Sequence, residues 1–88
     1  MTFDWDEANL EHIARHGVSP LEVEEAVTDP RRLGVPAYNL RGEVRWAVLG
    51  ATEAGRVLFV VLTRRHGRIR VVTARDATPR EKRRYRRR

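Results

Sequence analysis

Three strand-like segments separated by two short breaks constrain the fold of this chain more than any other feature. The segments are residues 43–50, 56–64 and 68–75. The middle one is apolar from Val57 to Leu62, as a central strand is. The breaks, residues 51–55 and the pair His66-Gly67, have the lengths of β-hairpin turns. The segments therefore predict an antiparallel sheet with the second segment in the middle.

A first helix is predicted before these strands. Asp4 or Asp6 can cap its start, and Gly17 stops it after His16. The i, i+3, i+4 spacing predicts one apolar stripe facing the core, with polar side chains projecting from another side. The predicted stripe is Leu10, Ile13 and Ala14, and the polar residues are Asn9, His12 and His16.

Two capping boxes mark two further helices. Ser19-Pro20-Leu21-Glu22 predicts a helix to about Thr28 that buries its apolar side chains and exposes its acidic ones. Thr78-Pro79-Arg80-Glu81 predicts a terminal helix over residues 78–88, which is rich in arginine and has Tyr85 as its only apolar anchor. We expect this last helix to fray unless RNA or a partner neutralises it. The side chains predicted to be buried in the first of these helices are Val23, Ala26 and Val27.

The elements combine into one α+β domain over residues 1–88. The expected order is (β)ααβββα, with a three- or four-stranded antiparallel sheet and the two N-terminal helices packed on one face. Phe3 to Trp5 is a possible first strand, and residues 33–39, with Gly34 and Pro36, are irregular or an edge strand. A chain of 88 residues has room for one core only.

Cellular location is predicted from what the sequence lacks. There is no cysteine, so neither disulfides nor thiolate metal sites are expected. The longest apolar run is far below the roughly 20 residues that cross a bilayer. The first residues are acidic, unlike a secretory signal. These features predict a cytoplasmic protein without a membrane segment.

A two-residue turn at His66-Gly67 also predicts the strand register. It pairs Arg64 with Ile69 and Leu62 with Val71, and beyond them Val60 with Thr73 and Leu58 with Arg75. That face is the expected core, with Arg64 and Arg75 at its two ends. The opposite face is half apolar and half cationic, and we expect a ligand there. Its predicted members are Arg45, Ala47, Phe59, Val61, Thr63, Arg70 and Val72.

Charge is divided unevenly along the chain. Residues 1–30 hold eight acids and one base, whereas residues 31–88 hold 17 bases and four acids, within a net charge of +6. All of the bases except Lys82 are arginine. Arginine binds phosphate through two hydrogen bonds and stacks on bases, which suits a nucleic-acid ligand. A GC-rich genome would also raise the arginine content, but it would not cluster the charges.

Cleavage of RNA without a metal needs only residue types that this chain has. The 2′-hydroxyl attacks the neighbouring phosphorus, so a protein must position the backbone, move two protons and stabilise charge. Arginines supply the charge and histidines move protons near neutral pH. His16, at a helix C-terminus, suits a general acid or a phosphate contact, or else it caps the helix carbonyls.

Other candidate residues also have two interpretations. Trp5 is either a platform for base stacking or a core residue under the first helix. His12 and His16 could hold a metal, but they lack a third ligand nearby and are more often surface histidines. An unpaired guanidinium would be costly at the ends of the core face, so Arg64 and Arg75 must each meet an acid, water or a phosphate. Asp6 and Glu7 are candidate acids for them.

Several motifs in this order resemble the BrnT family of type II toxins. The motifs are Phe3-Asp4-Trp5-Asp6-Glu7, Arg15-His16-Gly17-Val18-Ser19, Gly55-Arg56-Val57-Leu58, Ile69-Arg70-Val71-Val72-Thr73-Ala74-Arg75 and the terminal run from Glu81 to Tyr85. BrnT proteins are similar to RelE-like ribonuclease toxins, which are small α+β domains that cut RNA without a metal and arrest growth. Many relatives have a lysine where this chain has Arg15. A mechanism that requires a lysine base would therefore fail here.

The resemblance also implies partners and site residues. The partners are an RNA substrate and a BrnA-like antitoxin with a ribbon-helix-helix domain, assembled as two toxins with two antitoxins on operator DNA. No cofactor is expected. From the resemblance, the residues expected to be catalytic are His16, Arg64 and Arg75, and Trp5 and Tyr85 are expected to bind RNA. From their places on the first helix and on the cationic sheet face, His12, Arg45 and Arg70 are also expected to bind RNA. The alternative is a binding module without catalysis, which coats nucleic acid or only docks an antitoxin.

Overall fold

The computed structural model describes residues 2–37 and 42–87 of the chain. Asn39 and Arg88, which belong to the predicted edge segment and terminal helix, lie outside the described residues. No helix in the described ranges is long and apolar enough to cross a membrane. The elements in chain order are β1 (Phe3–Asp4), α1 (Glu7–Ala14), α2 (Pro20–Val27), β2 (Leu33–Val35), β3 (Arg45–Ala51), β4 (Val57–Arg65), β5 (Arg68–Asp76) and α3 (Pro79–Arg87).

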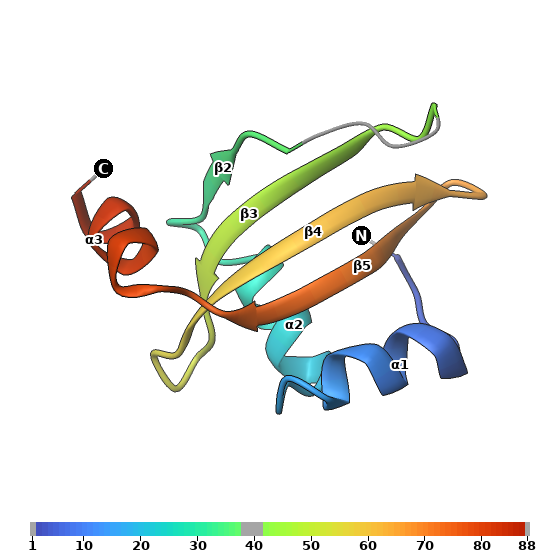
Figure 1. Cartoon of the computed structure of the whole chain (residues 1–88), viewed down its shortest axis with the longest axis horizontal. Coiled ribbons are helices and arrows are strands. Elements are labelled where there is room, and N and C mark those ends of the chain that lie inside the picture. The colour runs from blue at the N-terminus through green and yellow to red at the C-terminus, as the bar shows by residue number, and fades with distance from the viewer. Residues whose placement is uncertain (1, 38–41, 88) are drawn as a thin grey trace.

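A five-stranded mixed sheet forms the body of the molecule, with the strand order β1-β5-β4-β3-β2 (Figure 1). The three predicted strands are its centre and are antiparallel, which confirms the α+β class and the element order. The sheet is larger than the predicted three or four strands because both of its edges gain a strand. β2 pairs with β3 in an antiparallel direction, and β1 pairs with β5 in a parallel one. These short edge strands satisfy backbone groups that would otherwise be unpaired.

The turn between β4 and β5 is the predicted two-residue hairpin. His66 and Gly67 both have positive φ, 52° and 73°, which is the conformation whose twist matches that of paired strands. The turn sets the pairs Arg64–Ile69 and Leu62–Val71, as predicted.

Beyond these pairs the predicted register is wrong by one residue. A β-bulge shifts the pairing at Val61/Leu62, so that Val61 pairs with Thr73 and Phe59 pairs with Arg75. One extra residue in a strand moves every later side chain to the opposite face. Arg75 therefore lies on the face opposite the one that was predicted for it.

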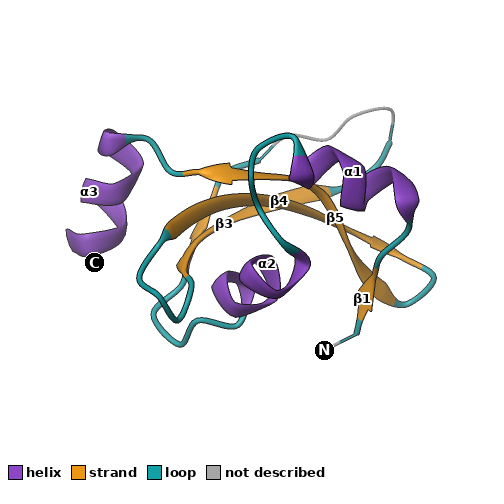
Figure 2. Ribbon diagram, turned by 90° about the horizontal axis from the view of Figure 1, so that it is seen from below, coloured by secondary structure: helices purple, strands orange, loops and turns teal. Residues whose placement is uncertain are grey.

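One face of the sheet, here called the helix face, is covered by α2, while α1 lies along β5 and contributes Ile13 to the same core cluster (Figure 2). In α1 the residues turned inward are Asn9 and Ile13, whereas Leu10 is 37% exposed and Ala14 is exposed as well, which corrects the predicted stripe. The Asn9 side-chain amide donates hydrogen bonds to the backbone oxygens of Asp4, at 2.8 Å, and Val71, at 3.5 Å. Because these hydrogen bonds satisfy the amide, the polar Asn9 can be buried between α1 and the sheet, at the place predicted for Leu10.

Helix α2 lies very close to β3. It buries Val23, Ala26 and Val27, as predicted, and both ends of its capping box are hydrogen-bonded. A Cβ atom at Gly50 would lie 2.0 Å from the backbone oxygen of Ala26. Only glycine fits at this position. Its missing side chain allows the backbone of α2 to pack directly against β3.

The opposite face of the sheet, here called the second face, carries a smaller apolar cluster next to α3. Leu49, Val57 and Ala77 are buried there, and Phe59 and Tyr85 pack against them. A polar contact holds α3 in addition to the predicted apolar anchor Tyr85, because the Arg75 guanidinium donates to both carboxylate oxygens of Glu81, at 2.8 and 3.1 Å. The Thr78–Glu81 capping box is also formed.

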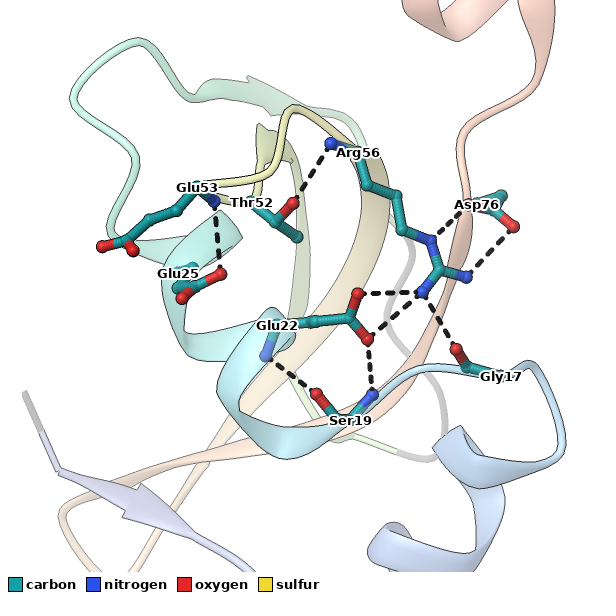
Figure 3. Close-up of polar contacts among 8 residues, drawn as sticks. All are labelled: Gly17, Ser19, Glu22, Glu25, Thr52, Glu53, Arg56 and Asp76. Carbon is teal, nitrogen blue, oxygen red and sulfur yellow. Dashed lines mark hydrogen bonds and ion pairs between the residues drawn. The ribbon is translucent and has the colours of Figure 1, made fainter.

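Arg56 joins four parts of the fold (Figure 3). Its guanidinium donates to Asp76 at 2.7 and 3.1 Å, to Glu22 at 3.1 and 3.2 Å, and to the backbone oxygen of Gly17 at 2.9 Å. Hydrogen bonds from Arg56 hold the pKa of Asp76 below its ordinary value. The Ser19 backbone N–H and then Arg56 lower the pKa of Glu22. The cluster fixes the α1–α2 loop and α2 against the ends of β4 and β5.

The contact between Gly50 and Ala26 predicts a large loss of stability on adding one methyl group. Gly50→Ala should lower the free energy of unfolding by about 3 kcal/mol, because the helix must move away from the sheet. Gly34→Ala is the matched control, since a Cβ there meets nothing within 4 Å. It should change stability by less than about 0.5 kcal/mol. Equal losses in urea unfolding would contradict this packing.

The Arg56 cluster predicts a pH dependence of stability. Carboxylates with a lowered folded-state pKa stabilise the fold above their unfolded pKa values, and this stability is lost as pH falls through the folded ones. The free energy of unfolding should therefore fall from about pH 5 to about pH 3, and Arg56→Gln should flatten that fall. Arg15→Gln, which removes the exposed Arg15–Glu11 pair, should keep the parent slope. Identical slopes for the parent and Arg56→Gln would exclude the cluster as the cause.

Candidate nucleic-acid interface

An open groove of about 520 Å³ lies between α1 and the hairpin end of the sheet. The start of β3 and the end of β4 form the floor of this groove, and residues of β5 and α1 form its wall. We call it the α1 groove. Its lining residues are Ala8, Asn9, His12, Glu43, Arg45, Thr63, Arg64, Arg65, Arg70, Val71 and Val72.

Two of the four arginines in the α1 groove are held by acids of the chain. Arg45 pairs with Glu43 at 3.2 Å. Arg70 pairs with Asp6 at 2.9 Å and with Asp4 at 3.5 Å, and its side chain is only 17% exposed. The Arg70 hydrogen bond lowers the pKa of Asp6. Asp6 thus meets Arg70 rather than Arg64 or Arg75. Their carboxylate partners fix the orientation of these two guanidinium groups and offset their positive charge.

The other two arginines are at the end of β4 and face solvent. Arg65 is 50% exposed and lies 4.0 Å from Asp4, a distance at the limit of an ion pair. Arg64 is exposed, and within residues 2–37 and 42–87 no carboxylate pairs with it. The exposed guanidinium of Arg64 beside the groove is therefore available for bidentate binding of phosphate.

A pair of histidines stands at the α1 side of the groove. His12 lines it, and its Nε2 lies 3.0 Å from the Thr73 hydroxyl. His16 is exposed one turn further along, outside the lining, with its ring centroid 5.5 Å from that of His12. Nowhere in the described ranges do three His, Cys, Asp or Glu side chains gather as metal ligands. Of the two imidazoles, His12 is therefore the one inside the groove.

Three of the predicted site residues have structural contacts elsewhere. Arg75 lies over the Phe59 ring at 4.2 Å and binds Glu81, so its charge is used to hold α3. The Tyr85 hydroxyl hydrogen-bonds to Asp29. The indole N–H of Trp5 donates to Glu24 at 2.8 Å, and its ring stacks on Phe3 and packs against the core. None of the three lines the α1 groove.

Arg65, which lines the groove, and Thr73, which contacts His12, were not among the predicted site residues. Arg65 follows Thr63 by two positions, so the alternation of side chains along a strand would have placed it on the same face. Thr73, the partner of His12, was placed on the core face by the register without a bulge, and no local sequence signal reveals the extra residue.

Comparison with protein families gives one match that covers most of the chain. Residues 5–81 match the model described as the ribonuclease toxin BrnT of type II toxin-antitoxin systems. The sequence matches no protein in the curated set. The matched segment runs from Trp5 to Glu81 and includes all the residues that line the α1 groove.

Proposed function

The chain belongs to the BrnT family of ribonuclease toxins of type II toxin–antitoxin systems, and we propose that it cleaves RNA in the α1 groove without a metal ion. The observation that carries this proposal is that one open groove is lined by an imidazole and by an exposed arginine that pairs with no carboxylate of the described residues. Membership of the family implies endoribonuclease activity, an RNA substrate and a cognate antitoxin. The groove supplies a place for the phosphate backbone.

The proposed reaction is an internal transfer at one phosphate. The 2′-oxygen attacks the neighbouring phosphorus and loses its proton to a base, while the bond from phosphorus to the 5′-oxygen breaks. An acid protonates the departing 5′-oxygen. The products are a 2′,3′-cyclic phosphate and a free 5′-hydroxyl. The protein must hold the phosphate in line and stabilise the charge on its two other oxygens.

Arg64 is the proposed ligand of the phosphate. Its guanidinium is free of carboxylates within the described ranges, and Arg65 on the next position adds a second cation at the groove. Arg45 and Arg70 lie deeper and are already paired, so they suit sugar or base contacts and orientation of the strand. We therefore assign the phosphate to Arg64 and the orientation of the strand to the arginines that are already paired.

The histidine pair is the proposed source of proton transfer. His12 lies in the groove and exchanges a hydrogen bond with Thr73, whose hydroxyl can serve either ring tautomer. His16, which the family resemblance implies as catalytic, lies beside it at a helix end that favours a positive charge. A strand in the groove meets His12 first, and His16 is the next proton carrier outward.

We also propose the form of the antitoxin complex. The family resemblance favours a BrnA-like partner with a ribbon-helix-helix domain, in an assembly of two toxins and two antitoxins that binds operator DNA. The mass of the complex purified from co-expressed genes measures this stoichiometry directly. A complex with one toxin and one antitoxin would contradict it.

The proposed groove predicts which substitutions abolish cleavage. The purified chain should cut RNA in EDTA and leave 2′,3′-cyclic phosphate ends. Arg64→Ala and His12→Ala should each lower the cleavage rate at least about 100-fold, a loss typical of a positioned charge or proton donor. His16→Ala tests the outer histidine, and we expect it to lose a similar factor. Arg83→Ala, on the exposed side of α3, is the charge-matched control and should cut at the parent rate.

Two outcomes would contradict the proposal in different ways. Parent rates for all three variants would mean that cleavage occurs elsewhere on the molecule. A well-folded parent that binds RNA without cutting it would favour the non-catalytic binding module.

Arg75 needs a separate comparison, because a structural role and a catalytic role both predict a loss on substitution. If Arg75 acts by holding α3, Arg75→Gln and Glu81→Gln should have similar, modest effects. If Arg75 binds the substrate, only Arg75→Gln should lower the rate strongly. Hydrogen exchange of the α3 amides reports loosening of the helix in either variant.

A further inference from the structure

A second cavity, of about 240 Å³, lies on the helix face at the same end of the sheet. We call it the Trp46 pocket. It opens between α2 and the hairpin end of the three central strands, whereas the α1 groove opens toward the second face and α1. Its lining includes Trp46, Val48, Leu62, Ile69, Arg32 and Arg64.

The composition of the Trp46 pocket suits a flat ring that carries a negative charge at one side. Trp46 is half-buried, and Val48 and Leu62 are buried, so the inner wall is apolar. Arg32 and Arg64 are exposed at the pocket. Among the residues that the structure describes, no carboxylate belongs to the lining. A nucleobase needs an aromatic or apolar surface for stacking, and its phosphate needs a guanidinium.

Arg64 connects the Trp46 pocket with the α1 groove, because it lines both cavities. A phosphate bound by its guanidinium would therefore have its own nucleotide, or the next one, within reach of the pocket. Arg32 comes from the loop after α2, where a guanidinium nitrogen donates to the Asp29 backbone oxygen at 3.3 Å. That hydrogen bond holds the Arg32 side chain near the turn at residues 29–32, beside the pocket.

We propose that the Trp46 pocket is a nucleotide subsite of the same RNA, in which one base next to the cleaved phosphate is held against Trp46 while Arg64 and Arg32 hold its phosphate. The inference rests on the proposed function for the identity of the ligand. The site itself is tested without cleavage. An apolar peptide is the less fitting occupant, because two cations at the pocket would have to be left without anions.

Binding of mononucleotides by the full chain tests the pocket directly. Calorimetry compares the four nucleoside 5′-monophosphates with ribose 5-phosphate, which has the same phosphate and sugar but no base. At least one mononucleotide should bind about 5- to 150-fold more tightly than ribose 5-phosphate, the range expected from stacking of one base. Trp46→Leu should remove this preference, whereas Trp46→Phe should retain much of it.

Arg32→Gln keeps the test valid if Trp46→Leu does not fold, because Arg32 is exposed. It should weaken binding of the mononucleotide and of ribose 5-phosphate alike. Arg31→Gln is its matched control, with the same change of charge one residue away and outside the pocket lining. Equal effects of the two arginine variants would overturn the proposal. So would equal affinities of ribose 5-phosphate and all four mononucleotides.

Cleavage of RNA that lacks one base separates a subsite for RNA from a site for free nucleotides. Removal of the base next to the cut should lower kcat/KM by the same factor as Trp46→Leu, and the two changes together should lose no more than either alone. No effect of base removal at any position would overturn the RNA subsite even if mononucleotides bind. A chain that binds mononucleotides but cuts no RNA would disprove the proposed function and leave the pocket standing.

Discussion

Pairing of arginines in and next to the central strands with acids from the first thirty residues is the interaction on which the rest of this structure depends. Arg70 meets Asp4 and Asp6, and Arg56 meets Glu22. A guanidinium that is partly buried needs a partner, because removal of its hydration is otherwise uncompensated. The uneven division of charge along the sequence is therefore first a feature of folding. Among residues 2–37 and 42–87, the cations outside such pairs, with Arg64 the clearest, mark the surface available to a ligand.

Much of the fold could be predicted from local patterns. The strand segments, the two-residue turn and the capping boxes each depend on residues a few positions apart, and all of them formed as expected. The choice of face in α1 could not be read from apolar spacing, because Asn9 is buried through hydrogen bonds to backbone atoms that are remote in sequence. The bulge was also hidden, since a run of β-branched residues gives no sign of one unpaired residue.

The same physical limits apply to the site. Strand alternation accounts for part of the α1 groove, because it places Arg45, Thr63 and Arg70 side by side. The hidden bulge changed the position of Arg75 and of Thr73. As a result, Thr73 contacts His12, and Arg75 contacts the Phe59 ring and Glu81. The family match supports a ribonuclease without selecting among the histidines, so the geometry of the groove decides which side chains are worth testing first.

The parallel pairing of β1 with β5 places the two ends of the described chain at opposite ends of the molecule (Figure 2). Phe3 sits beside Ile69, two residues from the hairpin turn, and the backbone N–H of Ile69 donates to Thr2. α3 lies beyond the other end of the sheet. An affinity tag or fluorescent protein fused to the N-terminus would thus emerge next to both cavities and could shield them from long ligands. The same fusion at the C-terminus would leave that entrance clear.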